Sequence, residues 1–338
     1  MPQDIMDIFN GDPWSTASLT AKINEQPEGQ AVNSWLDRLF TETGITSTTV
    51  AVERNQDSLE LVTVGDRGSY GSTKAQAGRD LVPFSTFHLP RHGGINADQV
   101  LSLRALGGEE AGDAAMQLAE AEIARLRKDI EATINFHRLG ALAGRILNPD
   151  MSVILDINQR FGVQPQNHYL DLTNPASEIG IKILAAKRKS EDAVGDLGSA
   201  TRYIAACSRT YYDDLIVADG FKEAFARAQD GAQFRNDTRS GFVYMGIEWI
   251  EAHSNVGGVT FIDEGTALLV PTSIPDLFVT SFAPADYVDL VSIIGVPFYA
   301  KQEVRRMGKG IDIEVQSNPL SLNKRPRSVI TLHSSAAP

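Results

Sequence analysis

The clearest hydrophobic pattern in the chain predicts a long amphipathic helix from about residue 114 to residue 143. Apolar or neutral residues recur there at alternating spacings of four and three, which places them on one helical face. This stripe consists of Ala119, Ile123, Leu126, Ile130, Thr133, His137 and Ala141. The opposite face carries Glu120, Glu122, Arg127, Lys128, Glu131 and Arg138. Because no leucine or isoleucine heptad is sustained, the pattern favours a helix laid across a sheet over a coiled coil.

Before this helix, the stretch from Ser47 to Leu89 is predicted to form a long polar hairpin. Val50 and Val52 alternate with polar residues, which is typical of strands, and the middle of the stretch, residues 65–72, is rich in turn residues. A two-stranded hairpin with few core residues cannot bury a face by itself. It must lie on its own domain or on a neighbouring chain, and this is the first indication of obligatory assembly.

The region before the hairpin divides into an arm without a clear pattern and a short predicted helix. The first thirty or so residues contain few apolar positions. Apolar residues then fall at helical spacing up to a stop signal at Gly44. The helical positions are Val32, Trp35, Leu36, Leu39 and Phe40.

After Gly144, short strand and helix patterns alternate, which indicates an α+β fold with a compact middle region inserted between flanking elements. Residues 152–156 and 168–172 are predicted to form one hairpin, and residues 259–262 and 267–270 a second one around a turn at 263–265. Helices are predicted over 179–190 and, as two short pieces, over 208–229. Further strands are predicted at 202–207, 242–244, 248–251, 287–294, 311–316 and 328–332.

Composition places the chain among ordinary globular proteins. Its 338 residues suffice for two domains or for one large domain with extensions, and 42% of them are hydrophobic. The net charge is -12 and no run of five basic residues occurs, so a broad nucleic-acid-binding face is not expected. We interpret the densest basic groups, Arg305-Arg306 with Lys309 and Lys324-Arg325 with Arg327, as solvated turns, with a small internal basic patch as the alternative.

The single cysteine and the N-terminal residues bear on the compartment. Cys207 follows small or apolar neighbours, which predicts a buried structural thiol and fits a reducing cytoplasm. The N-terminal residues have neither the basic nor the apolar region of a secretory signal, and no apolar run reaches the ~18–20 residues of a membrane span. We therefore expect a soluble protein that is intracellular at synthesis.

The residues of a catalytic, metal or cofactor site are not expected in this chain. No phosphate-binding loop, dinucleotide fingerprint or nucleophile elbow occurs. His88 and His92 have metal-like spacing, but Pro90 lies between them, so a plain loop is favoured over a metal site. His137 is interpreted as a satisfied core or interface residue, and Asp213-Asp214 as solvated carboxylates rather than a cation site. No acid, base and nucleophile form a recognisable constellation, so we predict no enzyme activity.

The order of these elements resembles the Hong Kong 97-type capsid fold, and four segments resemble the lambda-like major capsid protein E family more closely. Residues 37–42, Asp-Arg-Leu-Phe-Thr-Glu, are similar to the family's Leu-Phe-x-Glu segment, and residues 87–90, Phe-His-Leu-Pro, to its Arg-Leu-Pro element. Residues 248–263 with 268–271 resemble its A-domain hairpin. Residues 316–320, Gln-Ser-Asn-Pro-Leu, followed by Arg325-Pro326 and Val329, resemble its C-terminal strand and turn. The resemblance covers about Ala31 to Leu332.

The resemblance implies a domain order. It gives an N-terminal arm and short helix over 1–46, an E-loop over 47–89, and a P-domain with a long spine helix over 90–172. An A-domain follows over 173–295, and returning strands of the P-domain over 296–338. It also implies assembly contacts at six residues, with Trp35, Leu39 and Phe40 as anchors of the arm and Arg67, Tyr70 and Lys74 as contacts of the E-loop.

The function implied by the resemblance is that of a major capsid protein of a tailed double-stranded DNA bacteriophage. Copies would assemble as hexamers and pentamers into an icosahedral head in the virion, after a stage in the host cytoplasm. The implied partners are further copies, a separate scaffolding protein or protease, a portal protein and a decoration protein, and double-stranded DNA is enclosed rather than specifically bound. No covalent cross-link is expected at Lys74. An encapsulin-like shell subunit and a cytosolic enzyme of unknown type are the alternatives.

Overall fold

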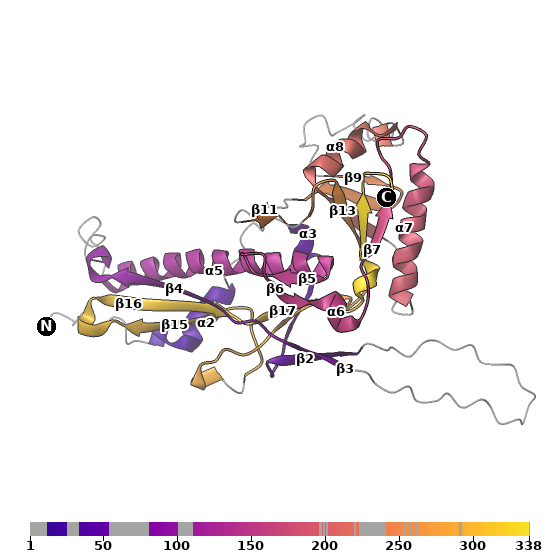
Figure 1. Cartoon of the computed structure of the whole chain (residues 1–338). Coiled ribbons are helices and arrows are strands. Elements are labelled where there is room, and N and C mark those ends of the chain that lie inside the picture. Colours follow the sequence, from indigo (N-terminus) through magenta and orange to yellow (C-terminus); the bar gives the residue numbers. More distant parts are fainter. Residues whose placement is uncertain are drawn as a thin grey trace, which may run out of the picture. The chain divides into compact units, whose positions relative to one another are not determined.

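The computed structural model describes residues 12–25, 34–53, 81–100, 111–195, 198, 200, 202–219, 221–222, 241–252, 255–256, 259–260, 262–290 and 293–337. The chain divides into two compact units, each assembled from three separate stretches (Figure 1). Unit 1 comprises Met1–Val50, Ser85–Arg138 and Val279–Ser321. Unit 2 comprises Ala51–Phe84, Leu139–Phe278 and Leu322–Pro338.

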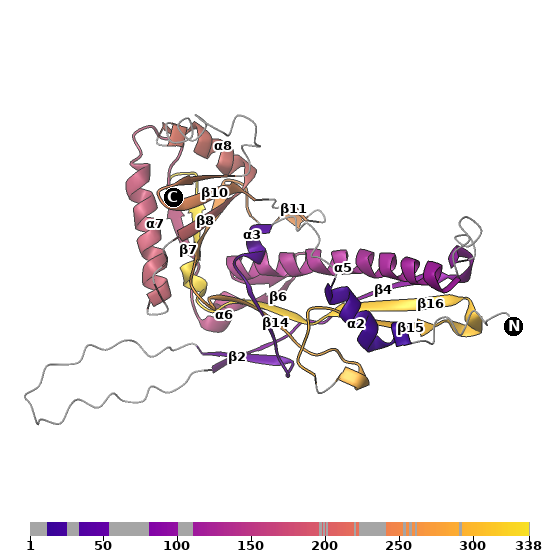
Figure 2. The same ribbon diagram turned by 180° about the vertical axis from the view of Figure 1, so that it is seen from behind.

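The core of unit 1 is a long helix packed on an antiparallel sheet. The helix, α5, spans Ala111–Ala143 and confirms the strongest prediction from the sequence. Its predicted stripe is buried at Ala119, Ile123, Leu126 and Ile130 against a sheet of order β15-β16-β4. The strands are β4 (Leu89–Asn96), β15 (Tyr299–Val304) and β16 (Gly310–Ser317). Figures 1 and 2 show α5, β4 and β16 running side by side.

Two short N-terminal helices complete unit 1. Helix α2 (Thr16–Glu25) buries Leu19 and Ile23 in the same core, although the sequence analysis expected no element there. Helix α3 (Ser34–Asp37) is only one turn long, so the predicted helix ends before Leu39 and Phe40. Strand β1 (Thr41–Gly44) follows and runs parallel to β14 (Phe278–Phe282), which is also paired with β17 (Pro319–Asn323). Strand β1 has no apolar residue, so its sequence contains no strand pattern.

The base of the predicted polar hairpin is present as two paired strands. These are β2 (Thr49–Glu53) and β3 (Leu81–Ser85). They bury Val52, Val82 and Phe84, and the Phe84 ring centroid lies 5.5 Å from that of Phe161. Residues 54–80, which include the predicted turn-rich middle, lie outside the described part of the chain.

Unit 2 is built on a six-stranded sheet of order β7-β18-β13-β8-β10-β9. Its core lies on one face, where alternate strand residues such as Ala205, Leu269 and Trp249 pack against α7 and α8. The prediction of a helix at 179–190, of the strand at 202–207 and of the strands at 242–244 and 248–251 is confirmed. The elements are β7 (Gln166–Tyr169), α7 (Ile179–Val194), β8 (Arg202–Cys207), α8 (Arg209–Val217), β9 (Phe242–Tyr244), β10 (Ile247–Glu251), β13 (Thr266–Thr272) and β18 (Ile330–His333).

Both hairpins predicted after Gly144 are wrong. Strand β6 (Val153–Asp156) pairs with β5 (Arg145–Leu147), whereas β7 pairs with β18 from the far end of the sequence. The two are separated by helix α6 (Ile157–Phe161), which Asp156 caps by accepting a hydrogen bond from the Gln159 amide. Strand β12 (Val259–Thr260) pairs with β11 (Asn255–Val256), whereas β13 lies between β8 and β18.

Two further local predictions are corrected. The predicted strand at 287–294 contains the 3-10 turn η5 (Val288–Leu290). The predicted loop around His88 and His92 largely forms β4, because its backbone pairs with β16 despite Pro90. The remaining short turns are η1 (Asp12–Trp14), η6 (Arg306–Gly308) and η7 (Pro326–Ser328). Among the described residues, no helix is long and apolar enough to cross a membrane.

Candidate assembly site on the arm segment

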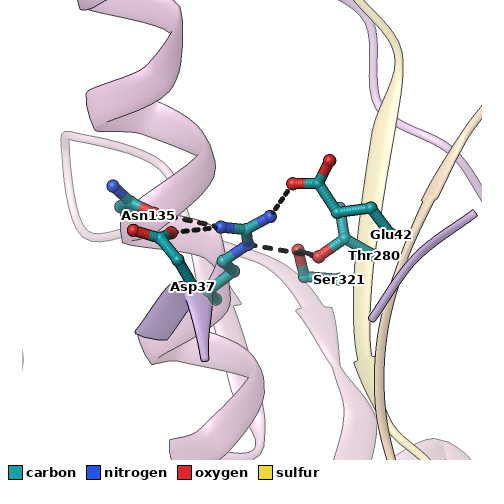
Figure 3. A network of polar contacts seen from close by, with 6 residues as sticks. Asp37, Glu42, Asn135, Thr280 and Ser321 are labelled. Atoms are coloured by element: carbon teal, nitrogen blue, oxygen red, sulfur yellow. Dashed lines mark hydrogen bonds and ion pairs between the residues drawn. The ribbon is translucent and has the colours of Figure 1, made fainter. Parts of the chain in front are cut away.

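A buried arginine fastens the segment from Ser34 to Gly44, here called the arm segment, to the core of unit 1 (Figure 3). Arg138 on α5 is only 4% exposed. Its Nη1 donates to Oδ1 of Asp37 at 2.8 Å, and its Nη2 donates to Oε1 of Glu42. Its Nε donates to the hydroxyl of Thr280 at 3.2 Å. One side chain therefore holds α3, β1 and β14 together.

The charges of this network explain why an arginine can be buried there. The guanidinium offers a rigid fork of donors, and carboxylates at α3 and β1 lie on two sides of it. The carboxylates stay 30% and 40% exposed, so they retain part of their hydration. The Thr280 hydroxyl is in turn hydrogen-bonded to the hydroxyl of Ser321 at 3.1 Å, which extends the network to β17.

The predicted arm anchors lie beside this arginine. Trp35 and Phe40 are buried, as is their neighbour Leu36, while Leu39 is half-buried. The Arg138 guanidinium carbon lies 5.6 Å from the centroid of the Phe40 ring, a cation–π contact. The aromatic anchors therefore pack within the chain's own unit 1, and their contact with another copy stays a prediction.

Close backbone approach fixes the end of the arm segment. The Ile45 amide donates to the Phe282 carbonyl at 2.9 Å, and the Gly295 amide donates to the Ile45 carbonyl at 2.9 Å. A Cβ added to Gly295 would overlap the carbonyl oxygen of Phe282. Only glycine leaves room for this approach.

A second buried arginine fastens α2 to the long helix. Arg127 donates from Nη1 to the Ile23 carbonyl at 2.5 Å and from Nε to Glu131 at 2.6 Å. Its guanidinium carbon also lies 4.8 Å from the centroid of the Phe298 ring. Arg127 and Arg138 were both assigned to the polar face of the long helix, and the structure shows that this face is partly covered. The N-terminal elements cover it, and a periodic pattern within the helix contains no information about them.

The three predicted E-loop contacts, Arg67, Tyr70 and Lys74, lie outside the described residues. The residues that the sequence analysis missed are Arg138, Asp37 and Glu42 as a single network. A signal for Arg138 was present, because it stands among Phe136, Leu139 and other apolar residues. A charge at such a position needs buried partners.

The remaining candidate residues, His137, Cys207 and His88, are buried in the protein's core or hydrogen-bonded to a neighbouring side chain. His137 is buried beside the Phe87 ring, and its Nδ1 has no hydrogen-bond partner among the described residues, so its interpretation as a satisfied residue is wrong in this respect. Burial lowers the pKa of His137 to about 4. Cys207 is fully buried, as predicted, and burial raises the pKa of its thiol. His88 hydrogen-bonds Asn318 at 2.9 Å, and no group of side chains in the described ranges could hold a metal.

Comparison with known proteins identifies relatives of this chain among phage capsid proteins. Residues 15–334 match the family model described as phage major capsid protein E. The major capsid protein of Salmonella phage Felix O1 is 20% identical, over 95% of this chain and 96% of that protein. The major capsid protein of Pseudomonas phage KPP10 is 24% identical, over 84% of this chain and 87% of that protein.

The fold agrees as well. The crystal structure of a prophage capsid protein from E. coli CFT073 superposes with a TM-score of 0.60, over 94% of this chain and 98% of that chain, at 13% identity. The predicted Hong Kong 97-type capsid fold is therefore confirmed. The family model, both relatives and the fold lead to one conclusion: the chain belongs to the phage major capsid protein E family and is a structural subunit of a phage capsid.

Proposed function

We propose that copies of this chain form hexamers and pentamers that close into the icosahedral head of a tailed double-stranded DNA bacteriophage. The observation that carries the proposal is the family match over residues 15–334, which spans most of both compact units. The protein is accordingly located in the virion capsid, and we propose that it assembles in the host cytoplasm. We propose that it acts as a building block of the shell and not as an enzyme.

The proposed domains follow the family's order. Residues 1–46 are the arm and 47–89 the E-loop. Residues 90–172 with 296–338 are the P-domain, whose spine helix is α5, and 173–295 are the A-domain. The sheet of unit 2 also contains β7 and β18, whose residues the resemblance gives to the P-domain. The family's names and the two compact units thus divide the chain differently.

The E-loop is proposed to lie over a neighbouring copy. In support, β2 and β3 form a separate two-stranded sheet that buries only three hydrophobic side chains, Val52, Val82 and Phe84. An isolated pair of this kind is marginally stable in water, and a neighbouring copy would supply further buried area. Arg67, Tyr70 and Lys74 are its proposed contacts, and Trp35, Leu39 and Phe40 are the proposed anchors of the arm.

The proposed partners other than further copies follow from head assembly. They are a separate scaffolding protein or protease, a portal protein and a decoration protein. The packaged double-stranded DNA is enclosed without specific binding, and the net charge of -12 supports this because like charge prevents adhesion to a polyanion.

Electron microscopy of the purified protein tests the proposal, alone and co-expressed with the products of neighbouring genes. Closed shells, or sheets of hexamers and pentamers, are the expected result. A uniform population of monomers or dimers under both conditions would overturn it.

A further inference from the structure

One side of helix α7 exposes an apolar row that ends in a positive charge. Ile181 is 64% exposed and Leu184 is 39% exposed. Arg188, also exposed, continues the row at helical spacing. Met245 at the β9–β10 turn is next to it, since a Cβ on Gly180 would lie 3.7 Å from the Met245 sulfur. We call Ile181, Leu184, Arg188 and Met245 the α7 face.

The fold of unit 2 does not require these apolar side chains. Helix α7 already buries Ile179, Ile183 and Ala186 against the sheet. Its outward residues could all be polar without loss of that core. An apolar row in water rimmed by charge is typical of a contact surface.

Helix α8 has an outward row of the opposite charge. Asp213 is exposed, and Val217, one turn later, is 73% exposed. Asp219 follows and is exposed too. The inward residues Tyr211, Tyr212 and Leu215 are buried in the core of unit 2. We call Asp213, Val217 and Asp219 the α8 face.

The α7 face and the α8 face are opposite in charge. Arg188 and Lys189 are exposed on α7, while the α8 face carries the two exposed carboxylates of Asp213 and Asp219. Neither Arg188 nor Asp213 has an ion-pair or side-chain hydrogen-bond partner in the part of the chain that the structure describes. In both Figure 1 and Figure 2, α7 runs along the flank of unit 2 and α8 lies near its top.

We infer that the α7 face of one copy docks on the α8 face of the next copy. Arg188 pairs with Asp213 across the contact, and Val217 packs on Ile181 and Leu184. A contact between two different faces is head-to-tail, and repetition of such a contact closes a ring when the rotation fits. The inference rests on the proposed function, because it supplies the contact that would hold a hexamer or pentamer together.

Charge reversal tests this pairing, because every copy carries both faces. Arg188→Glu alone and Asp213→Arg alone each place like charges across the contact. We expect either variant to reduce the yield of rings or shells about tenfold, as expected for a loss near 1.4 kcal/mol per contact. The double variant restores opposite charges and should recover most of the wild-type yield. Arg160→Glu on α6, an exposed position outside both faces, is the matched control and should assemble normally.

Yields are measured by native mass spectrometry and electron microscopy, with circular dichroism to verify folding. If a reversed charge unfolds the protein, Arg188→Gln and Asp213→Asn provide the same test at lower amplitude. Wild-type levels of assembly for both single variants, or no recovery in the double variant, would overturn the inference. Failure of the wild-type protein to assemble at all would instead count against the proposed function.

Discussion

At the scale of single residues, the most informative position is the buried Arg138. A charge that is 4% exposed is tolerated because two carboxylates, the Thr280 hydroxyl and the Asn135 side-chain oxygen accept its hydrogen bonds. Asn135 lies on α5 itself, whereas Asp37, Glu42 and Thr280 belong to three other elements, α3, β1 and β14. The arginine therefore links segments far apart in the sequence, and removing it leaves the carboxylates of Asp37 and Glu42 without their cationic partner.

Arg138→Met should lower the free energy of unfolding by about 3 kcal/mol, the lower end for a buried pair that loses one partner. The lower end applies because Asp37 and Glu42 are partly exposed and can be hydrated. Denaturant unfolding of unassembled protein measures the change. Arg125→Met on the same helix, where the arginine of the pair with Glu122 is 62% exposed, should lower the free energy of unfolding much less than Arg138→Met. Equal losses in the two variants would contradict a structural role for the network.

His137 makes stability depend on pH. Its pKa in the folded protein, about 4, lies below its ordinary value of 6.5 because the ring is desolvated. The unfolded state therefore binds more protons between these two pH values, and stability falls as pH falls from about 6.5 towards 4. The loss from this residue is at most about 3 kcal/mol.

His137→Asn should remove this part of the pH dependence. The stability difference between wild type and variant should shift in favour of the variant as pH falls from 7 to 4.5. Urea unfolding at several pH values measures it, and the comparison cancels the carboxylates common to both proteins. A parallel pH dependence for both proteins would show that the pKa of His137 is the same in the folded and unfolded states.

At the scale of elements, the sequence predicted correctly the helices and strands that have a strong local hydrophobic pattern. Helix α5 was predictable because its period persists over many turns, and α7 and β8 because each has a compact apolar signature. The predicted hairpins failed because their strands pair with partners far along the chain, as β7 does with β18. Pairing of this kind depends on the whole sheet. Strand β1 has no apolar residue and is held by backbone pairing and Arg138, so no pattern could reveal it.

Gly295→Ala tests the close approach that holds β1 in place. The added Cβ would overlap the Phe282 carbonyl, so the backbone must move and stability should fall by about 1–3 kcal/mol. Gly180→Ala in the first turn of α7 is the control, because its Cβ would meet only ordinary contacts and alanine favours helix. Thermal unfolding of the two variants checks the contrast. A Gly295→Ala protein as stable as wild type would mean that the segment can shift freely.

At the scale of the whole molecule, both compact units are discontinuous in sequence. The chain leaves unit 1 at Val50, returns at Ser85, and returns again at Val279. Residues 54–80 belong in sequence to the first of these excursions, between β2 and β3. Composition and periodicity predicted a compact middle region between flanking elements, but they could not predict which distant stretches join in each unit.

Replacing residues 54–80 by a short Gly-Ser linker should leave both units folded but abolish closed shells, because the proposed contact over the neighbouring copy is lost. Circular dichroism and electron microscopy together measure the two effects. A milder variant with alanine at Arg67, Tyr70 and Lys74 should form shells that dissociate at lower temperature. Shells of normal yield and heat stability in both variants would refute the E-loop proposal.

The position of strand β18 within the sheet of unit 2 affects when this sheet can form during synthesis. It lies between β7 and β13 in the sheet of unit 2, and its Ile330 and Leu332 are buried. Until the ribosome has released residue 333, β7 has no partner strand and β13 has one free edge. The complete sheet therefore forms only after translation of β18, more than 150 residues after β7. A nascent chain that ends before β18 therefore lacks the strand that joins β7 to the rest of the sheet of unit 2.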